Sequence, residues 1–99
     1  MEIKKKDRSS LCLACGFNFE EYFGFKPWSG DNSSLEICPS CGIQFGYDDA
    51  AGGNLKQRQE VYKIWRERWI KGGMRWWSKG HPKPDDWDPS EQLRHLDGR

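Results

Sequence analysis

The phrase Cys-x-x-Cys-Gly is the feature that most limits how this chain can fold. It occurs at residues 12–16 and again at 38–42, and the two copies contain all four cysteines of the 99-residue sequence. Two thiolates separated by two residues can bind one metal ion from a tight turn, and two such knuckles complete the four-sulfur tetrahedron that zinc prefers. Each glycine suits the turn because it has no side chain to strain. The spacing therefore predicts one closed, structural zinc site formed by Cys12, Cys15, Cys38 and Cys41.

Other chemistry for the cysteines stays open at this point. A four-thiolate site also accepts iron. Two disulfides would need an oxidising compartment, and the opening residues, MEIKKKDRSS, have the basic side chains of a signal peptide without the apolar stretch that follows them. A thioredoxin-like redox pair needs one Cys-x-x-Cys at the start of a helix in a βαβ unit, whereas both pairs here lie between strand signals. We therefore expect a cytoplasmic protein, in which paired thiols hold metal more often than they form disulfides.

The length of the chain suits one domain with a modest core. Only 35% of the residues are hydrophobic, but six Trp, five Phe and three Tyr can bury large areas, so we expect a small, aromatic-rich core. No apolar run approaches the roughly 20 residues that span a bilayer. We expect residues 1–10 to be a flexible basic N-terminus and residues 11–99 to be a single domain. Metal binding would contribute on the order of 10 kcal/mol to its folding.

Residues 11–53 carry the strand signals. Apolar side chains alternate with polar ones in three short stretches, at Phe17 and Phe19, at Leu35 and Ile37, and at Ile43, Phe45 and Tyr47. Between the first two stretches, KPWSGDNSS (residues 26–34) is rich in turn formers and predicts an exposed loop. The acidic pair at residues 48–49 is typical of a turn. We therefore expect β-hairpins that carry the two knuckles, as in a zinc ribbon.

The strongest helix signal covers residues 55–71. Asn54 stands where an N-cap is expected, and the glycine pair at 72–73 would end the helix. The apolar side chains share one arc of about 120° and would pack on the zinc ribbon; they are Leu55, Val61, Tyr62, Trp65 and Trp69. Arg58 falls inside this arc, so we expect it either to reach the surface or to pair with a carboxylate.

Residues 73–99 form a segment rich in Trp and Pro that ends in a short helix. Asp88 as N-cap, Pro89 in the first turn and Glu91 three residues after the cap predict that helix to about Leu96. The expected fold class is therefore α+β: a small zinc ribbon packed against one long C-terminal helix, with a short terminal helix after it.

Ten residues in and after the two knuckles, all within residues 11–50, form a recognisable pattern: Cys12, Cys15, Gly16, Glu36, Ile37, Cys38, Pro39, Cys41, Asp48 and Asp49. This pattern resembles a family of small bacterial proteins, the cysteine-rich CPCC proteins. The first knuckle reads Cys-Leu-Ala-Cys and lacks the proline and third cysteine that name the family. The second half, with RWI, GMRWWS and a late Trp-Asp-Pro, is similar to another group of uncharacterised bacterial zinc-ribbon proteins. The resemblance implies zinc and a ribbon fold. Some of these proteins look like neighbours of toxin and immunity genes, which implies protein binding.

The residues that we expect to bind a partner lie in the Trp-rich segment: Arg75, Trp76, Trp77 and Trp87. Trp, Met and Arg together match the chemistry of interface hot spots. Trp76 and Trp77 are neighbours, so both cannot easily enter one small core. The alternative is that these tryptophans cover the two sides of the helix–sheet core. The first hypothesis is a protein-interaction module.

Nucleic-acid binding is the second hypothesis. Residues 54–80 contain eight basic and two acidic side chains interleaved with Trp, which suits phosphates and bases. Against it, residues 11–53 contain one basic and six acidic side chains. The sequence does not predict an enzyme, because it has no Ser/His/Asp order, no phosphate loop and no free nucleophilic cysteine once zinc is bound. His81 and His95 do not form a ligand-spaced pair, and we expect them at the surface or at a helix end.

Overall fold

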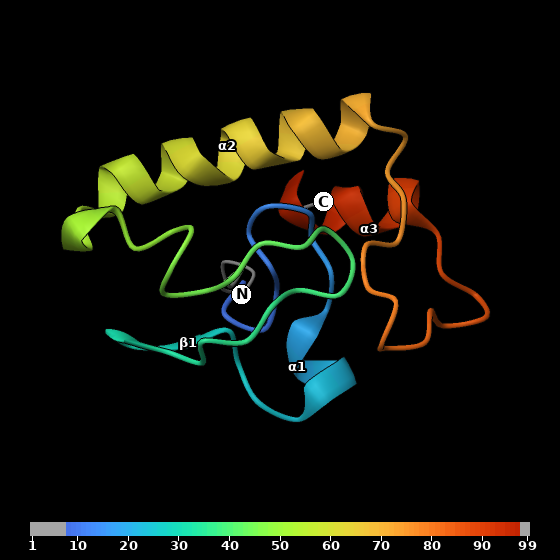
Figure 1. Cartoon of the computed structure of the whole chain (residues 1–99), viewed down its shortest axis with the longest axis horizontal. Coiled ribbons are helices and arrows are strands. Elements are labelled where there is room, and N and C mark those ends of the chain that lie inside the picture. The colour runs from blue at the N-terminus through green and yellow to red at the C-terminus, as the bar shows by residue number, and fades with distance from the viewer. Residues whose placement is uncertain (1–7, 98–99) are drawn as a thin grey trace, which may run out of the picture.

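Short knuckle loops fill the centre of the molecule, and helices surround them (Figure 1). The computed structural model describes residues 8–97. The expected N-terminal tail therefore lies mostly outside the described residues. The elements are, in chain order, α1 (Phe19–Phe23), β1 (Trp28–Ser29), β2 (Asn32–Ser33), a 3₁₀ turn (Ala51–Gly53), α2 (Leu55–Lys71), α3 (Pro89–Arg94) and a second 3₁₀ turn (His95–Asp97). Helix α2 runs along one side of the knuckle loops, and α3 lies beneath the second half of α2 (Figure 1).

The two knuckles have the same backbone geometry. In each, the amide of the first cysteine donates to the carbonyl five residues later (2.9 and 2.8 Å), and the amide of the glycine donates back to the carbonyl of that first cysteine (2.7 and 2.8 Å). Gly16 and Gly42 both have φ = 85°, a left-handed conformation that a side chain would strain. A single antiparallel bridge flanks each knuckle, Leu11 with Asn18 and Ile37 with Gln44. The repeated phrase in the sequence is therefore also a repeat in the structure.

The predicted strands are wrong. Within residues 8–97 the one sheet has two strands of two residues each, and it lies inside the segment predicted to be a loop. Trp28 pairs with Ser33 and Ser29 with Asn32. The alternation has another cause: the knuckle turns bury most of these apolar side chains in and beside the cysteine cluster. The buried ones are Phe17, Phe19, Ile43 and Phe45. The hairpins expected of a zinc ribbon are thus reduced to single bridges.

Helix α1 takes the place of the first predicted strand. The Asn18 side chain accepts a hydrogen bond from the Glu21 amide, and the helix ends at Gly24 with φ = 88°. Two acidic residues occupy its first turn, where their negative charge interacts favourably with the positive end of the helix dipole. Its buried residue, Phe19, packs edge-on against Phe45 at 5.3 Å between ring centroids. Both cap residues are ordinary helix signals in the sequence. The alternation of Phe17 and Phe19 with polar residues nevertheless predicted a strand here.

Helix α2 has the predicted bounds and the predicted caps. Asn54 accepts from the amide of Gln57, and Gly72 ends the helix. Tyr62 and Trp69 are buried, as predicted, and Val61 and Trp65 are half-buried against the core. The prediction for Leu55 is wrong, because its side chain is 65% exposed. The reason is that the first turn of α2 projects beyond the knuckle loops (Figure 1).

The short helix α3 begins as predicted. The Asp88 carboxylate accepts from the amides of Ser90 and Glu91, and Pro89 occupies the first turn. The helix ends at Arg94, and a 3₁₀ turn continues to Asp97 with Leu96 buried. Across residues 8–97, none of the helices combines the length and the apolar character needed to cross a membrane.

Candidate metal centre

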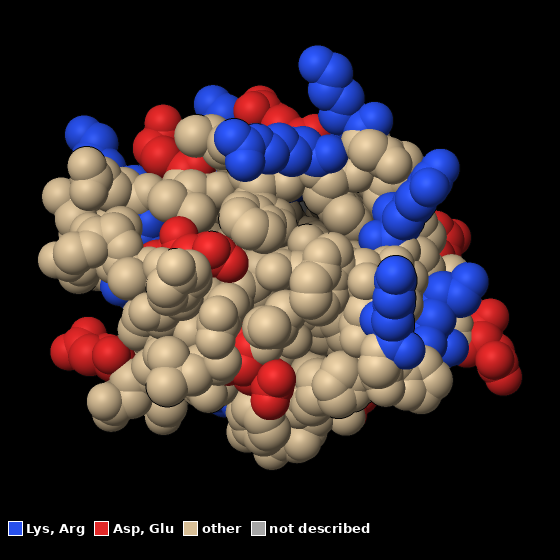
Figure 2. Space-filling view, in the orientation of Figure 1, with Lys and Arg blue, Asp and Glu red and all other residues tan. Residues whose placement is uncertain are grey.

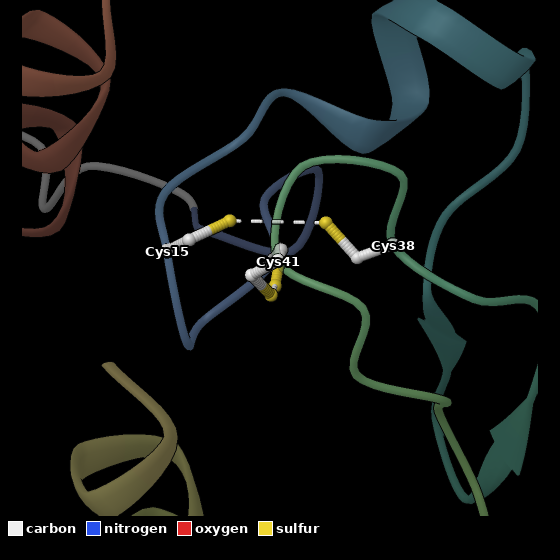
Figure 3. Close-up of side chains that lie close together, drawn as sticks. Cys15, Cys38 and Cys41 are labelled. Atoms are coloured by element: carbon white, nitrogen blue, oxygen red, sulfur yellow. Dashed lines mark hydrogen bonds between the residues drawn. The ribbon is translucent and has the colours of Figure 1, made fainter. Parts of the chain in front are cut away.

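The four cysteine sulfurs lie together at the centre of the molecule. Cys12 Sγ is 3.7 Å from Cys41 Sγ, and Cys15 Sγ is 3.7 Å from Cys38 Sγ. All four sulfurs lie within 4.8 Å of one another, so they could hold a metal ion. The sulfurs of Cys15 and Cys38 face each other across the cluster (Figure 3). A tetrahedron with Zn–S bonds of about 2.3 Å has edges of about 3.8 Å, and the two separations between the knuckles, 3.7 Å each, match that edge length.

The thiols are free, and each close pair joins one knuckle to the other. A disulfide would bring two sulfurs to about 2.05 Å, much closer than they lie here. Three cysteines are fully buried and Cys41 is 6% exposed. Burial, followed by hydrogen bonds with the neighbouring thiols, raises the pKa of Cys38 and of Cys41 well above the ordinary range. At Cys15 burial acts in the same direction, but hydrogen bonds from the other thiols and Ser40 outweigh it and lower the pKa. Without a cation the cluster therefore resists the multiple ionisation that a metal ion would favour.

Two tryptophans of α2 fix the second knuckle. Trp65 Nε1 donates to the carbonyl of Cys41 at 3.0 Å, and Trp69 Nε1 donates to the carbonyl of Ser40 at 3.1 Å. Both indoles were predicted to pack on the cysteine-bearing unit, and these two hydrogen bonds confirm that they contact it. The apolar ring fills space between α2 and the knuckle, while its N–H satisfies a backbone carbonyl that the turn leaves free.

Arg66, which the sequence analysis did not single out, fixes the first knuckle. Its Nε donates to the carbonyl of Ala14 at 2.8 Å and its Nη2 to the carbonyl of Leu13 at 2.7 Å. Both acceptors lie between the two cysteines of that knuckle. The fork of a guanidinium suits two adjacent carbonyls. One helix thus holds both halves of the cysteine cluster in register.

Gln92 of α3 connects the two knuckles directly. Its side chain is buried, and its Nε2 donates to the carbonyl of Cys15 at 3.1 Å and to Ser40 Oγ at 3.0 Å. Its Oε1 accepts from Trp87 Nε1 at 2.6 Å. Every polar group of this buried amide therefore has a partner. A glutamine in a short terminal helix carries no sequence signal for such a role, so Gln92 could not be predicted.

Asp49 is the buried carboxylate of the fold. It is fully buried and accepts from Trp28 Nε1 (2.9 Å), the Tyr62 hydroxyl (2.6 Å) and the Gly46 amide (2.6 Å). Arg58 donates from Nε to the Asp49 carbonyl at 2.8 Å and lies 4.0 Å over the Trp28 ring. Burial and the bond to Asp49 raise the pKa of Tyr62 well above its ordinary value. In the sequence this acidic pair has the signature of turn residues, which gives no sign that Asp49 joins the β1–β2 hairpin, the second knuckle and α2.

The residues predicted to bind a partner divide into two groups. Trp76 and Trp87 are half-buried and pack edge-on against each other at 5.3 Å, as part of the layer around the core. Trp77 is 54% exposed, and Arg75 is exposed. Partner binding by any of the four stays a prediction, but Arg75 and Trp77 are the two that are exposed.

Neither histidine joins the cysteine cluster within residues 8–97. His81 is exposed, and its carbonyl accepts from Trp76 Nε1 at 2.9 Å. His95 is the C-cap of α3, with Nδ1 3.4 Å from the Gly16 carbonyl. Both positions agree with the expectation of a surface or helix-end role.

The arrangement of the centre suits a structural metal better than a catalytic one. Four buried thiols lie close enough to supply four ligands to one metal ion, whereas catalytic zinc sites usually keep one position open for water or substrate. Comparison with family models, curated proteins and solved structures finds no match for this chain. The resemblance to CPCC proteins therefore stays a prediction.

Proposed function

We propose that the protein is a small cytoplasmic interaction module whose fold is organised by one structural zinc ion. The observation that carries the zinc part is the cluster itself: four free, buried thiols, with sulfur separations of 3.7 Å in two cross-knuckle pairs. Zinc favours four soft ligands in a closed tetrahedron. Iron accepts the same ligands, and its distinct absorption spectrum would identify it in the purified protein.

Zinc would act on the fold rather than on a substrate. The core around the knuckles is small, and the two longest strands of the described chain have two residues each, so sheet pairing contributes little. A structural zinc ion supplies on the order of 10 kcal/mol to the folding of small domains. Removing the metal with a chelator should therefore unfold residues 11–97. Retention of the helical circular dichroism signal after complete metal removal would contradict this role.

The interaction part is supported by Trp77 and its surroundings. A pocket of ≈ 270 Å³ lies between this indole and α2, and we call it the Trp77 pocket; it is lined by Cys41, Trp65, Arg68, Trp69 and Trp77. The backbone amide of Trp77 donates to the Pro39 carbonyl at 3.0 Å, which holds the residue beside the second knuckle. Exposed Trp and Arg beside a pocket are typical anchors of protein interfaces.

A pull-down from a bacterial lysate tests the interaction role with a matched pair of variants. Trp77→Ala removes the exposed indole, while Tyr47→Ala removes another exposed aromatic side chain, which is 74% exposed and outside the Trp77 pocket. We expect a protein that wild type and Tyr47→Ala retain and Trp77→Ala loses. Identical partner profiles for all three proteins, with each confirmed to be folded and metal-loaded, would contradict the proposal.

A further inference from the structure

The segment that contains Trp77 is also the most basic part of the molecule. Residues 68–83, which we call the basic segment, contain five basic side chains and no acidic one: Arg68, Lys71, Arg75, Lys79 and Lys83. All five are exposed. Among residues 8–97 the one ion pair joins Arg94 to Glu91, so none of these five cations forms an ion pair with a described carboxylate. Figure 2 shows Lys and Arg side chains gathered over the end of α2 and the chain that follows it.

The rest of the described chain has the opposite charge. Residues 8–67 and 84–97 contain seven basic and thirteen acidic side chains. Glu67 precedes the basic segment and the pair at 85–86 is acidic, so the positive region is bounded on both sides along the chain. A net charge near zero for the whole protein therefore conceals a local positive region. Such a region attracts a negatively charged partner of limited extent and repels one that continues past it.

An apolar anchor point lies within the same region. Trp77 and Arg68 line the Trp77 pocket, and the ring of Trp77 covers Gly42 closely enough that a Cβ there would lie 2.7 Å from it. One face of the indole is thus held against the knuckle, and the side chain remains 54% exposed. The pocket can accept one apolar side chain of a partner whose flanking residues meet the cations.

We infer that the basic segment and the Trp77 pocket together bind an acidic protein segment that carries an apolar side chain. This inference depends on the proposed interaction role and names the chemistry of the partner. Two observations favour protein over nucleic acid. A nucleic acid chain extends its phosphates past the patch toward the acidic remainder of the surface. Stacking of successive bases uses several free aromatic faces, whereas Trp77 is the one tryptophan of the six that is mostly exposed.

Fluorescence anisotropy with labelled synthetic probes tests the inference on the metal-loaded full chain at about 0.15 M salt, where charges more than about 8 Å apart are screened. The first probe is a peptide of Asp and Glu residues around a central Leu-Phe pair. The second replaces Leu-Phe by Ser-Ser, the third replaces the acids by Lys, and the fourth is single-stranded oligothymidine. We expect the first probe to bind at least about tenfold more tightly than each of the others.

Charge reversal identifies the surface without touching the core. Arg75→Glu with Lys79→Glu reverses two exposed cations of the basic segment. The control pair, Lys56→Glu with Lys63→Glu, makes the same change in net charge on α2, outside that segment. We expect the first pair to weaken the acidic peptide by at least about tenfold and the second by less than about threefold. Equal losses in both pairs would show attraction by net charge alone and overturn the inference.

Other results would also overturn it. Equal affinity for the Leu-Phe and Ser-Ser peptides would remove the apolar anchor, and tighter binding of oligothymidine would assign the surface to nucleic acid. No binding of the acidic peptide would reject the named partner class. If a lysate protein is lost with Trp77→Ala but retained by Arg75→Glu with Lys79→Glu, the interaction role stands and the acidic partner does not.

Discussion

Replacing Asp49 by alanine should remove a large part of the stability of the fold. The carboxylate is fully buried and accepts three hydrogen bonds, from Trp28, Tyr62 and Gly46. A hydrogen bond to a charged group contributes about 1.5–3 kcal/mol, and a buried donor left without a partner costs about 1–3 kcal/mol. Because Trp28 and Gly46 are only half-buried and can regain water, we expect a net loss of about 3–5 kcal/mol. A domain of this size has about 5–15 kcal/mol in total.

Urea denaturation of the zinc-loaded protein at fixed free zinc measures this loss. Asp48→Ala is the matched control, because its neighbouring carboxylate is half-buried and accepts one backbone hydrogen bond, from the Gln44 amide at 2.8 Å. We expect the control to cost about 1 kcal/mol. Asp49→Asn, which keeps one acceptor oxygen, should fall between the two alanine variants. If Asp49→Ala and Asp48→Ala differ by less than about 0.5 kcal/mol, the argument that Asp49 joins three parts of the fold is refuted.

Three further perturbations follow from the same contacts. The pKa of Tyr62 is raised in the fold, so the stability that its protonated hydroxyl contributes is fully present below the unfolded pKa of about 10. Above that pH the contribution is lost, by about 1.4 kcal/mol per pH unit. A stability difference between wild type and Tyr62→Phe that stays constant from about pH 9 to 11 would contradict this. Gly16→Ala should cost at least about 2 kcal/mol more than Gly24→Ala, because both have the same left-handed backbone but only a Cβ at Gly16 would collide with a backbone carbonyl, that of Gln92; equal melting temperatures would argue against that close approach. Gln92→Leu should cost about 2–3 kcal/mol by breaking both links to the knuckles, whereas Gln59→Leu, at an exposed position of α2, should change stability by less than about 0.5 kcal/mol; thermal denaturation compares the two.

The cysteine cluster and α2 were predictable because their signals are local and physical. Two knuckles of identical spacing leave few alternatives for four thiols, and α2 has an apolar arc, an Asn cap and a terminating glycine. The misplaced charge at Arg58 was also informative. The expectation was a surface position or a carboxylate partner. The structure instead pairs the guanidinium with two backbone carbonyls, of Asp49 and Ala50, and stacks it on Trp28.

The strands were not predictable from alternation alone. A period of two indicates a strand only where the backbone is extended, and here the same spacing arises because knuckle turns bury Ile43 and Phe45 beside the cysteines. Asp48 and Asp49 present the same difficulty. They are adjacent and chemically identical, yet one is fully buried and the other is half-buried. Only the position of the partners Trp28 and Tyr62, far away in sequence, distinguishes them.

Only the structure distinguishes which of the predicted partner-binding tryptophans is exposed. The sequence grouped Trp76, Trp77 and Trp87 together because all three are tryptophans in one irregular segment. Packing separates them, since Trp76 and Trp87 contact each other and the core while Trp77 remains mostly exposed. The charge of the segment was visible in the sequence, but its lack of described carboxylate partners was not.

The metal content of the purified protein tests the central claim most directly. Elemental analysis combined with X-ray absorption at the zinc edge reports both the amount of metal and its ligands. We predict one zinc per chain with four sulfur ligands at about 2.3 Å, and loss of that zinc when Cys15 and Cys38 are both replaced by serine. Less than about half an equivalent of bound metal in protein purified without chelator, or a first shell of nitrogen and oxygen, would contradict the claim.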